Sequence, residues 1–405
     1  MSDWAPISGR AAGGARSGPP ADPPPTTRHL PTDRHPPTDR TEEDAVGIPA
    51  SGATTLADVA ARAGVSLKTA SRAVNGEQHV REETRAKVLA AAADLGFQLN
   101  SSASLLARGI ASSFVGVVTG DLANPFYAAL AQGAASELRS HGLSVTLGSS
   151  DESSAQEGVL VDELARRSVR AVIAASAMTS HAPYEALQRR GVPVVFVDRA
   201  PTDIAADSIV LDNVAGARVA AEHLVSGGHR RIAFLGDFER LPTYRERLDG
   251  FRAAMQAMDA RLASDAAPAT SAADAPAGGA RTAAWADLVR EGAHDPEVAA
   301  RVTRELLDSA HPPTAILASN NRATLGVLRE LARRGDTTTA LVGFDDFDLA
   351  EVLGVTVIAH DARAMGAQAA RLVVERLADP RREPELVRLP TRLIERGSGE
   401  RPPRA

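Results

Sequence analysis

Residues 55–75, TLADVAARAGVSLKTASRAVN, contain two short helical patterns whose second member carries side chains suited to contacting DNA bases. In that second pattern, long or polar side chains face outward while small apolar ones face inward. The outward-facing residues are Leu67, Lys68, Ser71 and Arg72. A short helix with long polar residues near its start is what the major groove of DNA accepts. The stretch therefore predicts a DNA-reading helix, although other helical hairpins share parts of the pattern.

Motifs for catalysis, cofactors and metals are missing from the sequence. There is no cysteine, which excludes disulfides, thiolate zinc sites, Fe–S clusters and cysteine nucleophiles. The only lysines, Lys68 and Lys87, do not follow a glycine, so there is no Walker A loop. Asp345 and Asp346 would point to opposite faces of a strand, which argues against an acid–base pair. We expect no catalytic residue, no metal site and no cofactor.

The composition indicates a globular protein of several domains. The chain has 405 residues, 44% hydrophobic and 24% charged, with a formal net charge of −6. That overall charge gives no hint of nucleic acid, and residues 54–110 carry only seven basic against five acidic residues. No apolar run is long enough to cross a membrane, and residues 1–30 lack the apolar region of a secretion signal. A cytoplasmic protein with no membrane partner is the expectation.

The predicted DNA-reading helix would lie in a unit of three short helices within residues 54–99. Thr55 and Asp58 form a capping-box pattern, and Gly64 suits the tight turn between the first two helices. Ser66 can cap the second helix, and Gly96 would end the third. Residues 1–53 are rich in proline and almost without apolar pattern, so we expect a disordered extension.

From residue 114 onward, short apolar strands alternate with helices. This alternation predicts doubly wound parallel sheets. Its length of about 270 residues favours two sheets over one. Residues 263–284, rich in Ala, Asp, Pro and Gly, interrupt the pattern and are predicted to be a surface insertion. The predicted fold class is therefore an N-terminal all-α helix-turn-helix headpiece followed by an α/β core of two parallel-sheet subdomains.

The order of residues in the headpiece closely resembles that of the LacI/GalR family of bacterial transcription regulators. The resemblance continues through Gly76–Val80, Thr84–Val88 and Leu95–Phe97 to Asn100, and extends to about Ser398. Matching stretches of the core are 121–127 (DLANPFY), 194–199 (VVFVDR), 212–216 (DNVAG), 228–232 (GHRRI), 247–251 (RLDGF), 313–320 (PTAILASN), 343–346 (GFDD) and 392–396 (RLIER).

The resemblance implies a division of the chain. The headpiece would cover 54–99 and a hinge helix or linker 100–111, and a periplasmic-binding-protein-like core would cover 112–398, with a tail at 399–405. Within the core, the N-subdomain would take about 112–210 and 358–384, and the C-subdomain about 211–357 and 385–398. No heptad pattern follows Ser398, which favours a dimer over a tetramer.

The resemblance also implies roles for headpiece residues. Leu67 and Lys68 would be the principal base-reading residues, Leu67 by apolar contact, and Arg72 would reach a base edge such as guanine. Thr55, Ser66, Ser71 and Asn75 would mainly contact phosphates, and His79 is also placed at the DNA. Ser71 could equally be a surface serine of the helix.

In the hinge segment, NSSASLLARG at 100–109, the resemblance places Leu106 as a wedge in the minor groove. The alternative is an ordinary linker leucine. Ser104 stands where many relatives have arginine, so one contact with DNA would be missing.

For the core, the resemblance implies that a small effector binds in a cleft between the subdomains. Phe126 or Tyr127 would supply an aromatic face, Asp198, Arg247, Asn320 and Asp345 hydrogen bonds, and His360 a further cleft position. The alternative for Asp198 and Asp345 is that they only cap the segments that follow. A sugar is the favoured effector class, because each of its hydroxyls can both donate and accept hydrogen bonds. A nucleobase or another small metabolite is the alternative.

Three residues depart from the family pattern. Asn321 stands where aspartate is common, Gly354 where proline is frequent, and His360 where glutamine is frequent. They leave the identity of the effector open.

The function implied is a homodimeric, ligand-responsive repressor that binds pseudo-palindromic operator DNA. An inducer or a corepressor would use the same parts, and activation of transcription is a further possibility. A sugar-binding transport protein would need a secretion signal and no headpiece. An enzyme would need a motif that the sequence lacks.

Overall fold

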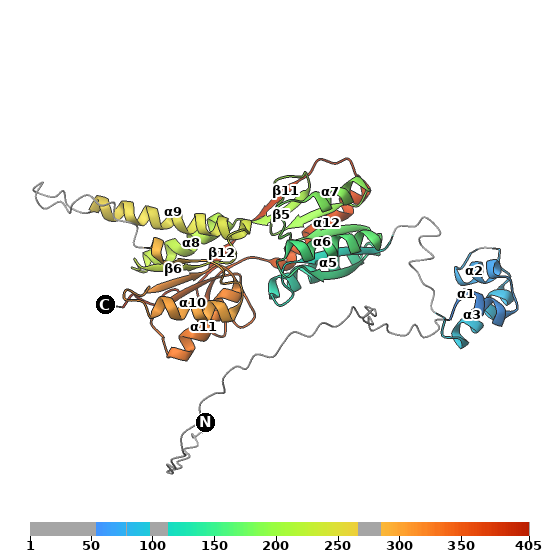
Figure 1. Cartoon of the computed structure of the whole chain (residues 1–405), viewed down its shortest axis with the longest axis horizontal. Coiled ribbons are helices and arrows are strands. Elements are labelled where there is room, and N and C mark those ends of the chain that lie inside the picture. Colours follow the sequence, from blue (N-terminus) through green and yellow to red (C-terminus); the bar gives the residue numbers. More distant parts are fainter. Residues whose placement is uncertain (1–53, 78, 98–111, 266–284, 405) are drawn as a thin grey trace, which may run out of the picture. The chain divides into compact units, whose positions relative to one another are not determined.

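The computed structural model describes residues 54–77, 79–97, 112–265 and 285–404 of the chain. The chain divides into two compact units, Met1–Leu99 and Asn100–Ala405, each described by itself below (Figure 1). The predictions for residues 1–53, for the hinge segment with Leu106, and for most of the insertion at 263–284 lie outside the described residues.

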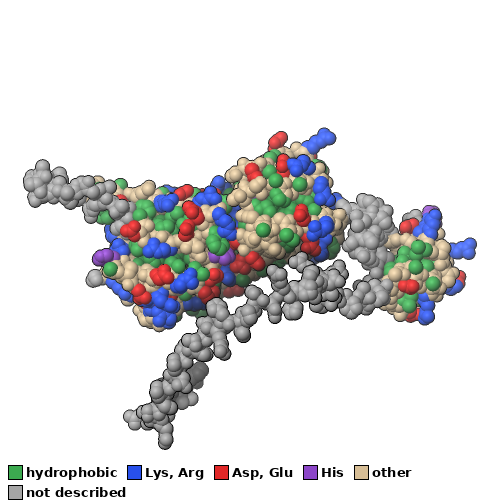
Figure 2. All heavy atoms as spheres, viewed as in Figure 1, with side chains coloured by type: hydrophobic (Ala, Val, Ile, Leu, Met, Phe, Trp, Pro, Cys, Tyr) green, Lys and Arg blue, Asp and Glu red, His purple; other side chains and the backbone are tan. Residues whose placement is uncertain are grey.

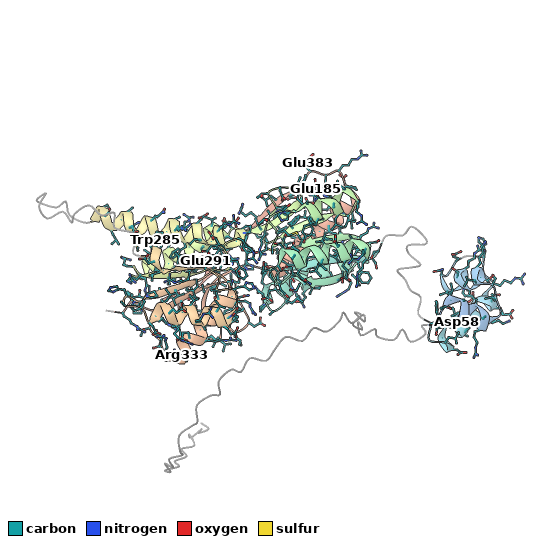
Figure 3. The ribbon with its side chains drawn as sticks, viewed as in Figure 1. Asp58, Glu185, Trp285, Glu291, Arg333 and Glu383 are labelled. Atoms are coloured by element: carbon teal, nitrogen blue, oxygen red, sulfur yellow. The ribbon has the colours of Figure 1, made fainter. Side chains whose placement is uncertain are left out.

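The first unit contains helices α1 (Leu56–Ala63), α2 (Leu67–Val74) and α3 (Glu82–Asp94). Thr55 and Asp58 form the capping box at the start of α1, which satisfies two backbone donors of the first turn (Figure 3 labels Asp58). Gly64 ends α1 with a φ of +67°, a conformation in which a side chain would be strained. The hydroxyl of Ser66 accepts a hydrogen bond from the Thr69 amide at 3.1 Å and caps α2.

A small apolar core holds these three helices together. Val59, Ala70 and Val88, one from each helix, are fully buried and belong to one cluster. Because α2 presents alanines to α1 and α3, it packs closely while its opposite face stays at the surface.

The second unit contains two six-stranded sheets. The N-subdomain is defined here by the sheet of order β11-β5-β4-β3-β1-β2 and its helices. Its strands are all parallel, as expected for a sheet buried on both faces. Its elements are β1 (Phe114–Thr119), α5 (Pro125–Arg139), β2 (Ser144–Ser149), α6 (Ser154–Arg166), β3 (Ala171–Ala174), α7 (Ala182–Arg189), β4 (Val194–Val197), β5 (Asp207–Leu211), α12 (Ala362–Ala378) and β11 (Leu386–Leu389).

The C-subdomain is defined by the sheet of order β12-β10-β9-β8-β6-β7. Its edge strand β12 runs antiparallel to β10, and the other pairs are parallel. Its elements are α8 (Asn213–Ser226), β6 (Ile232–Leu235), α9 (Pro242–Asp265), the 3₁₀ turn Ala286–Leu288, β7 (Val289–Arg290), α10 (Pro296–Leu307), β8 (Ala315–Ala318), α11 (Asn321–Arg334), β9 (Ala340–Phe344), β10 (Thr356–Ala359) and β12 (Arg392–Ile394).

Helices α5 and α12 pack against each other at two glycines. A Cβ atom at Gly133 would collide with the Arg363 carbonyl, and one at Gly366 with the Leu130 carbonyl. The backbones of these two helices are therefore in direct contact. This contact holds α12 in the N-subdomain, although the strand before it, β10, belongs to the C-subdomain.

The chain crosses between the subdomains three times, and the strand pairing departs most from the predicted approximate boundaries at the last of these crossings. The crossings follow β5, β10 and β11. Residues 386–389, predicted for the C-subdomain, form β11 and pair with β5 of the N-subdomain. Residues 358–359, predicted for the N-subdomain, belong to β10 of the other sheet. Local hydrophobic pattern identifies a strand but not the sheet that it joins, because the partner strand is distant in sequence.

Side chains of both signs are interspersed over the surface seen in Figure 2. None of the helices among the described residues is both long and apolar enough to span a membrane.

Candidate functional site

The exposed face of α2 presents the residues predicted to read bases. Leu67 is 55% exposed although it is a large apolar side chain, and Lys68 is exposed beside it. Ser71 and Arg72 are half-buried, and Ala70 behind them is fully buried. The helix thus offers an apolar and a cationic side chain near its start, where a recognition helix meets base edges.

Arg72 is held by a carboxylate of the same unit. Its Nε donates to Glu77 Oε2 at 3.1 Å, with both side chains about 40% exposed at the surface. Because such exposed pairs are weak, a guanine or a phosphate can compete for this guanidinium. Asn75 donates to the Ser71 hydroxyl at 3.3 Å, so these two predicted phosphate contacts lie together.

The remaining headpiece candidates lie in turns or outside the described residues. The hydroxyls of Thr55 and Ser66 both serve as helix caps. His79 is exposed with a φ of +77°. Leu106 lies outside the described residues.

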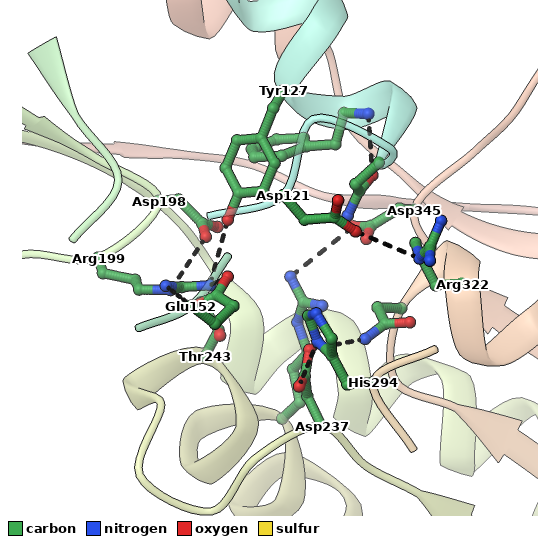
Figure 4. Close-up of a pocket in the computed structure, with 14 residues that line it drawn as sticks. Asp121, Tyr127, Glu152, Asp198, Arg199, Asp237, Thr243, His294, Arg322 and Asp345 are labelled. Atoms are coloured by element: carbon green, nitrogen blue, oxygen red, sulfur yellow. Dashed lines mark hydrogen bonds and ion pairs between the residues drawn. The ribbon is translucent and has the colours of Figure 1, made fainter. Parts of the chain in front are cut away.

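The core contains a narrow pocket between the two subdomains (Figure 4). Six of the seven residues predicted to contact an effector line it, namely Phe126, Tyr127, Asp198, Arg247, Asn320 and Asp345. His360 does not line it but lies behind Asp345, with its Nε2 at 2.9 Å from the carboxylate. Sequence reasoning missed the other lining residues, which are Asp121, Asn124, Glu152, Arg199, Asp237, Thr243, His294 and Arg322.

Most of the missed residues follow the carboxyl ends of strands. Asp121 and Glu152 come after β1 and β2, Asp237 and His294 after β6 and β7. Because parallel strands bring their carboxyl ends to one edge of a sheet, polar residues directly after each predicted strand would have found them.

On the N-subdomain side, Arg199 forms a buried network. Its Nη1 and Nη2 bind the two oxygens of Glu152 at 2.7 and 2.8 Å, and Nη2 also donates to the Tyr127 hydroxyl at 3.1 Å. Burial raises the pKa of the Tyr127 hydroxyl, and the positive charge of Arg199 partly counteracts that rise. A two-point contact between guanidinium and carboxylate fixes both side chains in one orientation.

On the C-subdomain side, Arg247 is held from several directions. Its Nε donates to Asn213 at 2.8 Å, its guanidinium lies 3.8 Å over the Phe344 ring, and its Nη2 is 3.7 Å from Asp345. Burial opposes ionisation of Asp345, but Arg247 and His360 hold the pKa of its carboxyl below the ordinary value.

Asp198 is the least satisfied carboxylate of the pocket. It is 6% exposed, and its one ion pair is with Arg199 Nε at 3.4 Å. Within the described ranges it accepts no hydrogen bond from another side chain or amide. Burial raises the pKa of the Asp198 carboxyl, and the positive charges of Arg199 and Arg247 partly counteract that rise.

Neither Asp198 nor Asp345 caps a helix, since no described helix has either of them as its N-cap residue. Asn320, in contrast, caps α11 through its Oδ1 and donates to Asp237 at 2.9 Å.

A third pair, Asp237 and His294, completes the C-subdomain wall. Their Oδ1 and Nδ1 atoms are 2.9 Å apart, and the imidazole stacks on Phe238 with ring centres 4.8 Å apart. Burial would lower the pKa of His294, but the Asp237 carboxylate raises it above the ordinary value.

Side chains from both subdomains meet across the pocket. Arg322 of α11 lies 3.3 Å from Asp121, and Asn321 donates to Asn124 at 2.9 Å. The cavity between them measures about 30 Å³, room for about two water molecules.

Two family models match the chain. "Bacterial regulatory proteins, lacI family" matches residues 55–100, and "Periplasmic binding protein-like domain" matches residues 221–399. The HTH-type transcriptional regulator CelR of Thermobifida fusca is 31% identical over 361 residues, which cover 85% of this chain and 98% of that protein. The chain belongs to the LacI family. The family and the fold class predicted from the sequence are thereby confirmed.

Two solved LacI-family structures match most of the chain. One, described as a CelR–cellobiose complex, has 29% identity and a TM-score of 0.59, covering 85% of this chain and 99% of that one. The other is the lac repressor dimer bound to operator and the anti-inducer ONPF, with 25% identity, a TM-score of 0.64 and coverage of 85% and 99%. These relatives are transcriptional regulators, and this LacI-family chain is a DNA-binding transcriptional regulator whose core matches the periplasmic binding protein-like domain.

Proposed function

We propose that this LacI-family regulator is a homodimeric repressor whose affinity for operator DNA changes when a sugar binds in the cleft. The observation that carries the proposal is the convergence of Phe126, Tyr127, Asp198, Arg247, Asn320 and Asp345 on one pocket between the subdomains. An aromatic face beside carboxylate, guanidinium and amide groups matches the hydroxyls of a sugar. The CelR–cellobiose complex and the lac repressor with its anti-inducer support a small ligand in such a core.

The DNA contacts belong to the proposal as well. Leu67, Lys68 and Arg72 read bases, Thr55, Ser66, Ser71 and Asn75 contact phosphates, and His79 and Leu106 contact DNA beside them. The exposed face of α2 supports the first three assignments. We place the headpiece at 54–99, the hinge at 100–111 and the core at 112–398.

An exposed apolar patch supports the dimer. Leu349, Val352 and Leu353 lie in one segment of the C-subdomain and are 58%, 81% and 53% exposed. Clustered exposed apolar side chains of this kind mark protein interfaces. A twofold dimer carries two headpieces and therefore binds a pseudo-palindromic operator. Because the target is chromosomal DNA, the proposed location is the bacterial cytoplasm.

The coupling follows from two states of the core. A ligand changes operator affinity only if it binds one arrangement of the subdomains better than the other. The cross-cleft contacts of Asp121 with Arg322 and of Asn124 with Asn321 hold one such arrangement. A sugar whose binding separates these residue pairs stabilises a different arrangement of the two subdomains.

The test is operator binding by the full chain with and without sugars. Symmetric promoter fragments selected from a random library are titrated by fluorescence anisotropy, first alone and then with ribose, glucose or cellobiose. A shift of operator affinity of at least fivefold with one sugar is expected, and its sign separates inducer from corepressor. Sugar concentrations are also followed during incubation, since consumption of the ligand would contradict a role in binding alone.

A further inference from the structure

The side chains that line the cleft carry more negative than positive groups. Five carboxylates line it, together with three guanidiniums and one imidazole. The excess is therefore one or two negative charges, depending on whether His294 is protonated. In a partly buried site, such charges act on a ligand with little screening from solvent.

All three guanidiniums are already bound to groups of the chain. Arg199 uses Nη1 and Nη2 for Glu152 and Tyr127, and its remaining Nε lies 3.4 Å from Asp198. Its donors therefore face carboxylates, a phenol and the Ser176 carbonyl. An anion that binds this arginine must first displace the buried carboxylate of Glu152, which is 2% exposed.

The other two guanidiniums are occupied in the same way. Arg247 donates to Asn213 and to the Ser319 carbonyl, and its third nitrogen faces Asp345. Arg322 faces Asp121 at 3.3 Å and donates to the Ala123 carbonyl. Among the described residues, every guanidinium of the cleft thus has a carboxylate beside it. The nitrogens Arg199 Nε, Arg322 Nε and Arg247 Nη2, which make no hydrogen bond there, lie 3.4, 3.3 and 3.7 Å from carboxylate oxygens, so an anion that approaches them meets a negative charge.

One carboxylate remains available to a ligand. Asp198, buried and without a hydrogen-bond donor from the described residues, points into the cleft (Figure 4). A carboxylate accepts hydrogen bonds only, so its complement is a hydroxyl or an ammonium group.

We propose that the cleft selects a polyhydroxylated ligand without negative charge, a neutral sugar or an amino sugar, and rejects phosphorylated sugars and sugar acids. The selection is by exclusion, because Glu152 and Asp121 neutralise the two arginines that an anion would use. This inference rests on the proposed function and narrows the class of its effector.

Matched sets of sugars test the inference on the full-length protein. Melting temperatures are measured with glucose, glucosamine, glucose 6-phosphate and gluconate, and likewise with ribose and ribose 5-phosphate. We expect a neutral or amino member to raise the melting temperature, and its anionic counterpart to bind at least 30-fold more weakly. Stronger stabilisation by a phosphate or an acid than by its neutral parent overturns the inference and leaves the proposed sugar response intact. Stabilisation by no member, together with an operator affinity that is unchanged by ribose, glucose and cellobiose, contradicts the proposed sugar response itself.

Freeing an arginine should relax the exclusion. In Glu152→Gln, Arg199 loses the carboxylate that binds both of its Nη atoms, and in Asp121→Asn, Arg322 loses the carboxylate that it faces. We expect the anionic counterpart of the bound sugar to gain at least tenfold in affinity in one or both variants. Asp121 lies at the rim of the cleft, 16% exposed, so its substitution keeps the test available if Glu152→Gln does not fold.

The matched control is Glu163→Gln on α6. Glu163 pairs with Arg167 at the surface, outside the residues that line the cleft, and its substitution changes the net charge equally. We expect it to leave the preference between neutral and anionic sugars unchanged. Equal behaviour of Glu152→Gln, Asp121→Asn and this control would overturn the proposed exclusion.

Discussion

Asp198 and Asp345 occupy equivalent positions in the two subdomains. Each directly follows the third strand in the order of its sheet, β4 or β9, and each has a φ of +68°. A left-handed backbone is uncommon for a residue other than glycine and persists where the surrounding structure enforces it. The two sheets therefore present one strained, buried carboxylate each to the cleft. Their environments differ, since Arg247 and His360 hold the Asp345 carboxyl ionised while burial raises the pKa of Asp198.

Arg247→Ala should abolish the response to the effector while operator binding is retained. The guanidinium lies between Asn213, Phe344 and Asp345. Its loss removes a positive charge that offsets the cost of burying the Asp345 carboxylate. The core should also lose about 3 kcal/mol of stability. Operator titrations with and without sugar, together with urea unfolding, measure both effects. A response equal to that of the wild type would remove Arg247 from the site.

Arg72→Ala should weaken specific operator binding by about 1–3 kcal/mol and leave nonspecific binding nearly unchanged. The reason is that a base contact contributes only at the cognate sequence, whereas phosphate contacts contribute everywhere. Anisotropy titrations against the operator and against a scrambled duplex at one salt concentration separate the two. An equal loss on both duplexes would show that Arg72 acts on the DNA backbone instead.

Val352→Arg should shift the protein from dimer to monomer. Val352 is 81% exposed between Leu349 and Leu353, and a charge there would have to be desolvated in an interface. Sedimentation velocity gives the oligomeric state. Leu386→Arg on β11 serves as the control, because that leucine is also exposed (57%) but lies in the other subdomain. The same loss of dimer in both variants would argue against the patch at 349–353.

Glu330→Gln should destabilise the core at neutral pH by about 1–3 kcal/mol, with a smaller effect in acid. Hydrogen bonds from Arg333, Arg304 and Arg334 to this carboxylate, which is 1% exposed, hold its pKa far below the ordinary value of 4.5 (Figure 3 labels Arg333). Because the folded pKa is depressed, the stabilisation is complete above pH 4.5 and is lost as the pH falls toward the folded value.

Melting temperatures of both proteins from pH 7 to pH 3 check this prediction. The difference between the wild type and Glu330→Gln should narrow below about pH 4.5 as the unfolded carboxylate becomes protonated. A difference that stays constant over this range would show that packing, and not charge, explains the loss.

Local residue patterns were sufficient for the three helices of the headpiece. Thr55, Gly64 and Ser66 act through contacts within a few residues, so their types and spacing define where α1 ends and α2 begins. The core strands β1 to β6, β8 and β9 were recognisable for a similar reason, since a buried parallel strand is a short continuous apolar run, whereas β7, β10, β11 and β12 were not predicted. Six cleft residues were also assigned from sequence, through the stretches shared with the LacI family.

Only the tertiary structure decided which side chains meet and which sheet each late strand joins. Glu152 binds Arg199, 47 residues away, and Asp121 faces Arg322 of the other subdomain. Residues 386–389 pair with β5 and not with their neighbours in sequence. Short-range physics determines helices, strands and caps, and these follow from sequence. Pairing across a sheet edge or a cleft depends on where distant segments come to lie, and so the charge balance of the cleft became visible only in the folded chain.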